Sequence, residues 1–322
     1  MPSQGFAPFP WQPPRRRQLD VVVGGDHPWL EVTLRGAQAP RVQIPERGRG
    51  MGKRLEALLG FCDGAAQLLA ARRGVLRVQL LDEDPCVPCI RFDAPVEVDD
   101  GGLLIPDPYC LMSGGYGALR EEWERRGLPC WRQRLPVALW RGSSTGLEPL
   151  DLNNLHHNRR YQLCQRGRRD PQLLDARFTA VVQSRDAQTQ RELTELLQRQ
   201  DLLRPRVEPW DAALHRWLIE IDGNVNSWGL LWKLLSGSCV LRVASHRRQW
   251  YHHRLQPWRH VVPVEADLAD LNQQVRWCVR HPDACEAIAL AGQRLARQVV
   301  AELGDSLVAA CHAYGERWLA PG

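Results

Sequence analysis

The sequence is almost without lysine, because of its 42 basic residues only Lys53 and Lys233 are lysines. We attribute this skew to codon usage in a GC-rich genome, so a high arginine count says little about function. Basic and acidic residues alternate along most of the 322 residues, and the formal net charge is only +5. A nucleic-acid-binding protein would show a basic stripe with interleaved exposed aromatic residues. We therefore expect no nucleic-acid partner.

Long apolar runs are also missing. No run approaches the roughly 18 apolar residues of a membrane-spanning helix, and the first 30 residues have no apolar segment typical of a signal peptide. We expect a cytoplasmic protein with at most peripheral contact to the inner membrane face, through Arg15–Arg17 beside Trp11. Ten cysteines are present, but thiols that are not exported stay reduced.

Several familiar site motifs are absent. Only Cys86 and Cys89 form a C-x-x-C pair, without a second pair at zinc-ribbon spacing, so we expect thiols rather than a bound metal. The chain lacks a Walker P-loop and a G-x-G-x-x-G after a strand. It also lacks the G-x-S-x-G elbow of many hydrolases. These absences argue against P-loop nucleotide hydrolysis, nicotinamide chemistry and serine hydrolysis.

What is present is an alternation of predicted strands and helices, which is typical of parallel sheets with crossover helices. In the first half, the pattern predicts strands at Asp20–Val23, Leu30–Leu34 and Val75–Leu81, a helix over Met51–Arg73 that Gly74 ends, and a helix over Tyr116–Arg126. In the second half it predicts strands at Leu135–Trp140, Phe178–Val182, Trp217–Ile221 and Ser238–Val243, and helices at Gln188–Gln200 and Ser227–Leu235. The last 57 residues are predicted to be almost wholly helical.

Two loops that follow predicted strands have the composition of anion sites. Asp222–Trp228 precedes a predicted helix, with Asn226 or Ser227 placed to cap it, and such a loop offers free backbone N–H groups and a helix dipole to a phosphate. Arg141–Gly146 combines small residues, hydroxyls and an arginine fork. In open parallel sheets ligands bind at the carboxyl ends of the strands, where both loops are expected. An ordinary capped turn remains the alternative.

An acidic turn follows the strand predicted at Val75–Leu81. Asp82, Glu83 and Asp84 leave its end together. A carboxylate at such a position can act as a general base toward an attacking hydroxyl, although three adjacent acids also suit a solvated turn.

Longer segments carry a more specific signal. The run WLIEIDGNVNSW at Trp217–Trp228 continues into Lys233–Ser238, and the run QWYHHRLQPWRHVVPV at Gln249–Val264 continues into Asp267–Leu271. Together they resemble two signatures of glycosyltransferase family 90, which includes capsule-associated, lipopolysaccharide-modifying and protein O-glucosyltransferase enzymes. Further similarities to this family lie at Leu139–Gly146, Pro171–Thr179 and Ala284–Gln293, so that the resemblance covers roughly residues 75–300 and is specific from residue 139 onward.

The resemblance implies an α/β fold of the GT-B type, with two Rossmann-like domains facing a cleft and a helical C-terminal tail. We expect an acceptor-side domain over 1–135, a nucleotide-sugar donor domain over 136–295, and a C-terminal helix over 296–322 that packs back on the N-terminal domain. It implies no metal ion and no cofactor, the UDP-sugar being a co-substrate.

The resemblance also implies donor-binding residues. They are Arg141, Gly142, Ser143 and Thr145 on one phosphate loop, Arg160 as a nucleotide-binding arginine, and Gly223, Asn224, Val225, Asn226 and Ser227 on a second phosphate loop. Many members have a basic residue two places after the serine of the second loop, where this sequence has Gly229. Lys233, one helical turn further on, is a candidate to supply that charge.

The catalytic base implied by the resemblance is an aspartate before a proline. Here Leu80–Pro85 is one residue longer than usual, so Asp82 is preferred and Asp84 is the alternative. The implied reaction is an inverting, metal-independent transfer of glucose or xylose from a UDP-sugar to a hydroxyl of a glycan, lipid-linked or protein acceptor, in a bacterial cytoplasm. The alternative function is a non-catalytic nucleotide- or sugar-binding protein of the same fold.

Overall fold

The structure, a computed structural model, describes residues 9–10, 19–36, 38–146 and 148–321. The Arg15–Arg17 segment for which membrane contact was predicted lies outside these residues. Among the residues described, no helix is both long and apolar enough to cross a membrane. The chain divides into two compact units. The first comprises Met1–Tyr116, His246–His253 and Val299–Gly322, and the second comprises Gly117–Ser245 and Arg254–Gln298.

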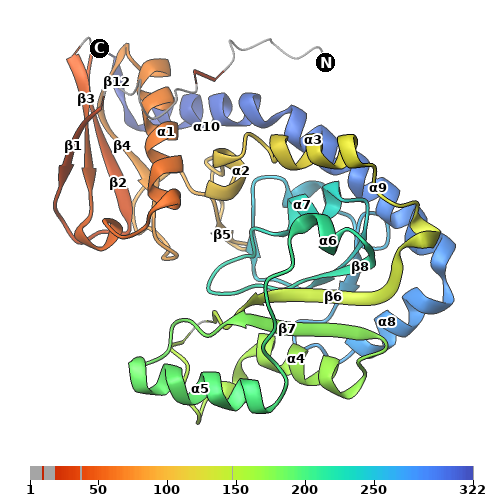
Figure 1. The fold of residues 1–322 in the computed structure, drawn as a ribbon. Coiled ribbons are helices and arrows are strands. Elements are labelled where there is room, and N and C mark those ends of the chain that lie inside the picture. The colour runs from red at the N-terminus through yellow and green to blue at the C-terminus, as the bar shows by residue number, and fades with distance from the viewer. Residues whose placement is uncertain (1–8, 11–18, 37, 147, 322) are drawn as a thin grey trace. The chain divides into compact units, whose positions relative to one another are not determined.

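The first unit contains a mixed sheet of five strands in the order β1-β3-β2-β4-β12 (Figure 1). The strands are β1 (Asp20–Val23), β2 (Trp29–Arg35), β3 (Gln38–Ile44), β4 (Arg72–Gln79) and β12 (Ala320–Pro321). Only β1 and β3 pair in parallel, while β2 is antiparallel to both β3 and β4. The prediction that this half is Rossmann-like is therefore wrong. The turn at Gly36, with a φ of +70°, reverses the chain directly from β2 into β3, so no crossover helix separates them.

Helices of the first unit include α1 (Lys53–Leu68), α2 (Pro108–Met112) and α10 (Leu303–Trp318). Of these, α1 and α10 pack on this sheet, and α2 packs on α1. Tyr314 of α10 is buried and donates from its hydroxyl to the carbonyl of Val75 in β4 at 3.0 Å. A short antiparallel pair joins β5 (Ala94–Pro95) to β10 (Arg247–Arg248).

The second unit is built on a fully parallel sheet in the order β11-β9-β8-β6-β7 (Figure 1). The strands are β6 (Leu135–Ser143), β7 (Leu174–Ala180), β8 (His215–Glu220), β9 (Cys239–Val243) and β11 (Val262–Val264). Numbered along the chain within this unit, the order is 2-1-3-4-5, which is that of flavodoxin-like doubly wound folds. The predicted parallel α/β architecture is thus confirmed for this half of the chain.

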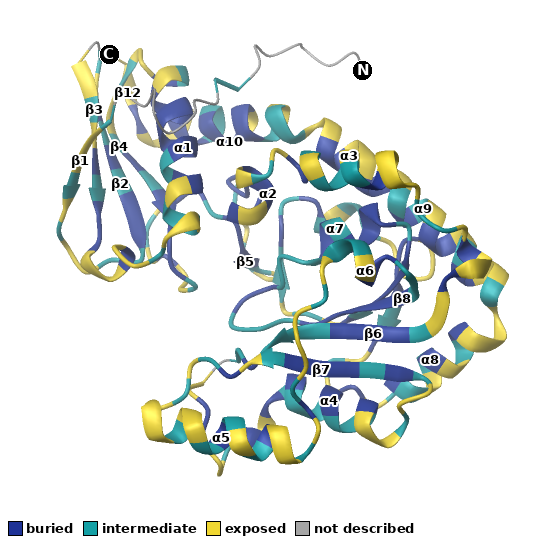
Figure 2. Ribbon diagram, in the orientation of Figure 1, coloured by how far each residue is buried: buried dark blue, intermediate teal, exposed yellow. Residues whose placement is uncertain are grey.

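The crossover connections of this sheet carry most of the helices. These are α4 (Arg159–Arg169), α5 (Ala187–Arg199), α6 (Pro209–Ala212) and α7 (Leu230–Leu235). The helix α3 (Gly117–Arg126) precedes β6, and α8 (Leu271–Arg280) and α9 (Pro282–Ala301) follow β11, with the last residues of α9 in the first unit. Figure 2 shows that the central part of β6 is buried, as expected for a strand covered on both faces.

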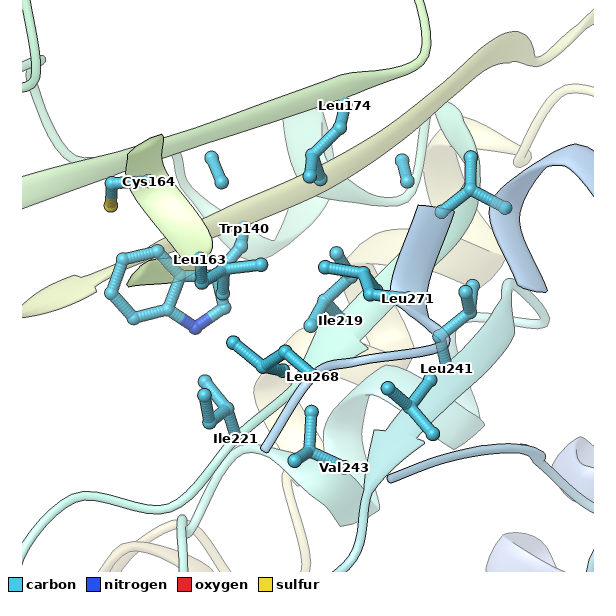
Figure 3. Packing of buried hydrophobic residues seen from close by; sticks show 14 of the residues in the cluster. Trp140, Leu163, Cys164, Leu174, Ile219, Ile221, Leu241, Val243, Leu268 and Leu271 are labelled. Carbon is cyan, nitrogen blue, oxygen red and sulfur yellow. The ribbon is translucent and has the colours of Figure 1, made fainter. Parts of the chain in front are cut away.

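The core of the second unit lies on one face of this sheet. Ala138 and Trp140 of β6 meet Phe178 of β7 there, with the Trp140 and Phe178 rings edge to face at 5.8 Å. Figure 3 shows Trp140 near Leu163 of α4, in a cluster that also takes in Leu268 and Leu271. This packing holds β6 against α4, and the candidate site lies beside the end of β6 and the start of α4.

Most predicted elements are found within a few residues of their expected bounds. The helix predicted over Met51–Arg73 ends earlier, at Leu68, and Gly74 lies inside β4 instead of stopping the helix. The strand predicted to end at Trp140 runs on to Ser143. The predicted helix Ser227–Leu235 begins only at Leu230.

Candidate active site

The order of strands in the second unit defines one place where its sheet changes direction. The chain starts at β6, adds β7 on one side, and then adds β8, β9 and β11 on the other. The loops that leave the carboxyl ends of β6 and β8 therefore diverge at this point. In open parallel sheets, ligands bind in the crevice that such diverging loops create.

Arg160, in the first turn of α4, joins these two loops. Toward the loop after β6, its Nη1 donates to the carbonyl of Ser143 at 3.0 Å and to Thr145 Oγ1 at 2.5 Å. Toward the loop after β8, its Nε donates to the carbonyl of Asp222 at 2.9 Å and its Nη2 to that of Ile221 at 3.1 Å. Arg160 is only 9% exposed. Desolvation lowers its pKa to about 10, so it remains charged at neutral pH.

Gly223 permits the loop after β8 to approach Thr145 and Arg160 closely. A Cβ at this position would lie 2.4 Å from Thr145 Oγ1 and 3.0 Å from Arg160 Nη2. Its backbone N–H donates to the carbonyl of Val225 at 3.1 Å. The contact between the loops thus requires glycine for reasons of space, since the φ of Gly223 is not in the left-handed region.

Asn158 connects the first loop to the start of α4. Its side-chain oxygen accepts from the N–H of Tyr161 and caps the helix, while its Nδ2 donates to the carbonyl of Ser144 at 3.2 Å. Ser144 in turn exchanges hydrogen bonds with the backbone of Val182. The sequence analysis missed these residues and α4 itself. The signal available was an asparagine, a preferred N-cap residue, directly before Arg159.

A polar cavity of about 210 Å³ opens at this place. It is lined by Thr145, Gly146, Glu148, Leu150, Asn154, His157, Asn158, Arg159, Arg160, Asp222 and Gly223. The amino-terminal end of α4, an 11-residue helix, borders this cavity through Asn158, Arg159 and Arg160, and the positive end of a helix dipole favours an anion. The arrangement suits an anion such as a phosphate.

The structure brings together Thr145, Arg160 and Gly223, three of the residues for which donor binding was predicted. Val225 and Asn226 are buried within the second loop. The Ser227 N–H is bound by Asp222 Oδ1 at 3.2 Å. Asn224 lies beside Val225 in the same loop and does not line the cavity.

The prediction that Asn226 or Ser227 caps the following helix is wrong. The N-cap of α7 is Gly229, and no side chain caps this helix. The hydroxyl of Ser227 instead accepts from the N–H of Gly229 at 3.3 Å. The N–H of Ser227 donates to Asp222 Oδ1 within the loop, and the helix begins three residues later, at Leu230.

Arg141, Gly142 and Ser143 occupy the last residues of β6 rather than a loop. The Arg141 guanidinium donates to Asp175 of β7, with Nη2 at 2.6 Å from Oδ2, and Arg141 does not line the cavity. Gly142 is needed for packing, since a Cβ there would lie 2.6 Å from the Trp140 ring. Of this segment, only the Ser143 carbonyl takes part in the contact with Arg160.

The side chain of Lys233 in α7 lies beside Gly229. If Gly229 carried a Cβ, that atom would lie 3.2 Å from Lys233 Nζ. The Nζ of Lys233 donates to Glu220 Oε2 at 2.5 Å and to the carbonyl of Ile219 at 2.8 Å. Lys233 is 8% exposed and Glu220 4%. The ammonium therefore lies close to the place where the resemblance suggested it, but a buried carboxylate neutralises its charge.

The acidic turn belongs to the first unit, and each of its acids faces an arginine. Asp82 accepts from Arg54 Nη1 at 2.9 Å, and the carboxylate is 22% exposed. Glu83 pairs with Arg47 at 2.6 Å. Within the described residues, no group of three or more His, Cys, Asp or Glu side chains is placed to hold a metal ion.

Asp84, the alternative base, is the acid most strongly engaged. Arg247 donates to both of its oxygens, at 2.9 and 3.0 Å, and also binds the buried Asp93. These hydrogen bonds are the main reason that the pKa of Asp84 is lowered, and Arg91 adds to the effect. A lowered pKa makes Asp84 a weaker proton acceptor.

The fold and the site define an α/β protein with a doubly wound parallel sheet. A cavity lined by polar residues lies at its switch point, between the loops after β6 and β8. Residues 116–303 match the model of glycosyl transferase family 90. The chain belongs to glycosyl transferase family 90, which confirms the resemblance drawn from Trp217–Leu271.

Individual relatives share about a quarter to a third of their residues with this chain over the matched segments. Uncharacterized protein 035R of Invertebrate iridescent virus 3 is 31% identical over 166 residues, which is 49% of this chain and 14% of that protein. Protein O-glucosyltransferase 2 of Danio rerio is 27% identical over 187 residues, 57% of this chain and 32% of that protein. Protein O-glucosyltransferase 3 of Homo sapiens is 26% identical over 172 residues, 53% of this chain and 30% of that protein. The chain thus spans a third or less of these three relatives.

Among solved structures, Anabaena HepE in complex with UDP-glucose is 12% identical, with a TM-score of 0.38, over 59% of this chain and 50% of that one.

Proposed function

We propose that this chain is a glycosyltransferase that moves a sugar from a UDP-sugar to an acceptor hydroxyl, by an inverting displacement that needs no metal ion. Glucose and xylose are the proposed sugars, and the proposed acceptor is a glycan, a lipid-linked glycan or a protein. Membership of the family supports this function, as do relatives that are named protein O-glucosyltransferases.

The observation that carries the proposal is the contact that Arg160 makes with both loops at the switch point. This buried cation holds the ends of β6 and β8 beside a polar cavity at the amino-terminal end of α4. A leaving diphosphate would find there backbone N–H groups, the helix dipole and the charge of Arg159, which lines the cavity. Fixed donors of this kind stabilise developing negative charge as a metal ion does in other transferases.

In the proposed reaction the acceptor hydroxyl gives its proton to the Asp82 carboxylate while its oxygen forms a bond to the anomeric carbon. The bond from that carbon to the β-phosphate oxygen breaks, and UDP leaves. A general base contributes about 10² to 10⁴ in rate. We favour Asp82 over Asp84 because Arg247 donates to both oxygens of Asp84 and lowers the pKa of that carboxyl from its ordinary value.

A second candidate function rests on the ion pairs of the acidic turn. Since Arg54 and Arg247 bind the two candidate bases, a protein that binds a nucleotide sugar without turning it over is the alternative. The two functions differ in whether product forms from bound donor.

The test measures transfer and hydrolysis of UDP-glucose and UDP-xylose, with and without EDTA, for the unaltered protein and for Asp82→Asn and Asp84→Asn. We expect UDP binding to persist in both variants. We expect turnover to fall by about 10² or more in Asp82→Asn alone, and EDTA to have no effect. Near-normal turnover by Asp82→Asn would refute the assignment of the base, and donor binding without turnover by the unaltered protein would favour the alternative function.

A further inference from the structure

The first unit contains a cavity of about 380 Å³ that borders the acidic turn. Its lining includes Pro85 and Cys86, which directly follow Asp84, and Trp318, the last residue of α10. Arg91, which also lines it, donates to the carbonyl of Pro85 at 3.1 Å and lies 3.8 Å from Asp84 Oδ1. The turn that carries both candidate bases is therefore in contact with the wall of this cavity.

Trp318 gives the cavity an accessible aromatic wall. The residue is 40% exposed. The Tyr314 ring lies 5.1 Å from the indole, and the Arg317 guanidinium lies 5.7 Å from the indole centroid, so neighbours on both sides hold the ring in place. Ligand sites in proteins typically combine such aromatic surface with a few placed polar groups.

Polar atoms beside this ring are accessible as well. Asp99, an exposed residue of the lining, accepts through Oδ1 from the N–H of Gly101 at 2.9 Å, and its Oδ2 has no hydrogen-bond partner among the described residues. Arg317 is also exposed and donates through Nη1 to the carbonyl of Gly101 at 2.7 Å, which leaves the N–H groups of Nη2 and Nε for a ligand. The contacts with Gly101 thus hold an acceptor and several donors in one wall next to Trp318.

The helix end at this cavity distinguishes it from the donor cavity. α4 meets the donor cavity with its amino-terminal end, whereas α10 meets this one with its carboxyl-terminal residues, Arg317 and Trp318. The carboxyl end of a helix dipole disfavours an anion. Arg91, the other arginine of the lining, is engaged by Pro85 and Asp84. An uncharged ligand therefore suits this cavity better than a phosphate does.

The neighbouring edge of β4 is occupied by other parts of the first unit. β12 pairs with the start of β4 (Figure 1), and Ile90 accepts from the N–H of Gln79 at 2.8 Å and donates to the carbonyl of Arg77 at 2.9 Å. Between them, the hydroxyl of Tyr314 donates to the carbonyl of Val75. A peptide that binds by adding a strand needs a free edge, so this arrangement argues against a peptide ligand.

We infer that this cavity holds the acceptor of the proposed transfer, and that the acceptor is a glycan chain. The inference rests on the proposed function, which requires an acceptor hydroxyl at the acidic turn. A sugar hydroxyl both donates and accepts, so it pairs with the Asp99 carboxylate and with the Arg317 N–H groups. The apolar face of a sugar ring packs on the Trp318 indole. A free glycan and a lipid-linked glycan offer these same groups.

Cys86 reports on occupancy, because this exposed thiol lines the cavity. Cys89 also lines it, but burial raises the pKa of the Cys89 thiol, which therefore reacts slowly. Cys130, the other cysteine found exposed, lies in the second unit and is the internal control. Peptide mass spectrometry measures iodoacetamide alkylation at each thiol in saturating UDP, while maltotriose, xylotriose or chitotriose is added. We expect at least one trisaccharide to slow alkylation of Cys86 and to leave Cys130 unchanged.

Two pairs of variants locate the effect. Trp318→Ala removes the aromatic wall, and Asp99→Asn removes the carboxylate while it keeps the shape of the side chain. Each should weaken the saccharide protection of Cys86 about tenfold. The matched controls Trp258→Ala and Asp283→Asn change exposed residues of the second unit outside the lining, and they should behave like the unaltered protein. Thermal unfolding shows that each variant is folded.

Kinetics connects the cavity to transfer. In Trp318→Ala, the KM for the protecting trisaccharide should rise about tenfold, and more than the KM for the UDP-sugar. A chain that turns over no donor would refute the proposed transfer and with it the acceptor role. A chain that turns over donor but leaves Cys86 unprotected would refute this inference alone, because protection is measured without turnover.

The source of the glycan is read from maltotriose and dodecyl maltotrioside, both below the micelle concentration. Equal protection of Cys86 assigns the acceptor to a free glycan, and stronger protection by the dodecyl compound assigns it to a lipid-linked one. Three results would overturn the inference. No trisaccharide protects Cys86 at high millimolar concentration; dodecyl maltotrioside alone protects it; or inorganic phosphate or a serine-containing peptide protects it as strongly as the best trisaccharide.

Discussion

At the scale of single residues, Arg160 is a positioning residue, because its hydrogen bonds hold two loops together. Four of its hydrogen bonds go to the ends of β6 and β8, so the protein already uses most of its N–H groups. The resemblance predicts that this residue binds the nucleotide, and the structure places it beside the candidate cavity. Its role as an internal brace between two loops depends on three-dimensional proximity, which the sequence does not contain.

This role predicts the effect of Thr145→Val. The substitution keeps the shape of the side chain but removes the hydroxyl that accepts from Arg160 at 2.5 Å. A hydrogen bond to a charged group contributes about 1.5–3 kcal/mol, so we expect about 2 kcal/mol less unfolding free energy and about tenfold weaker UDP binding. Denaturant unfolding and calorimetry measure the two effects. The control is Thr194→Val on α5, whose hydroxyl bonds only within its own helix; equal losses in both variants would contradict the role.

Lys233 supports a second prediction at this scale. The substitution Lys233→Met removes the ammonium that pairs with the buried Glu220 carboxylate. Breaking a buried ion pair in this way typically lowers the free energy of unfolding by about 3–5 kcal/mol. The double variant Lys233→Met/Glu220→Gln should recover a large part of that loss of unfolding free energy. If the double variant is as unstable as the sum of the single variants, the pair is not the reason that Lys233 is needed.

At the scale of elements, the second loop depends on the close approach of Gly223. In Gly223→Ala the added Cβ would meet Thr145 Oγ1 at 2.4 Å, so the loop must move away from Arg160. Overpacking of this kind costs about 1–3 kcal/mol, and we expect measurable UDP binding to be lost. Gly304→Ala in α10 is the matched control, since its Cβ meets nothing; it should stabilise the helix by about 0.5–1 kcal/mol. Unchanged UDP affinity in Gly223→Ala would contradict the account.

Elements with a strong local pattern were predictable. β8 and β9 each contain a run of three apolar residues, as expected of strands in a parallel sheet that is covered on both faces. α4 was missed because it buries Arg160 and Gly167 alongside only Leu163 and Cys164, so its apolar stripe is too weak to read. β3 was missed because Pro40 interrupts it, and proline argues against a strand. Without β3, the antiparallel character of the first sheet could not be foreseen.

At the scale of the whole chain, the pairs formed by acidic residues predict how stability depends on pH. The folded pKa of Asp84 is below its unfolded value because Arg247 binds it. Its contribution to stability is therefore present above the unfolded pKa of about 4 and is lost as the pH falls through the folded value. Asp151 and Asp186 have lowered pKa values through backbone hydrogen bonds and act in the same direction.

We therefore expect the unfolding temperature to fall steeply below about pH 4. The fall in unfolding temperature should be shallower in Asp84→Asn, because the asparagine has no carboxylate to protonate. Asp20→Asn, an exposed residue of β1, should follow the unaltered protein. Scanning calorimetry between neutral and acid pH measures these curves, and identical acid profiles for Asp84→Asn and the unaltered protein would show that the pair with Arg247 contributes nothing.

The central claim is that a UDP-sugar binds where the loops after β6 and β8 meet. Hydrogen–deuterium exchange of the amides in residues 143–146 and 222–227, with and without UDP, tests that claim most directly. We predict that UDP slows exchange in both segments and at the start of α4, and that it leaves β7 and α5 unaffected. UDP binding without slower exchange in these segments would contradict the account, because the nucleotide would then occupy another part of the chain.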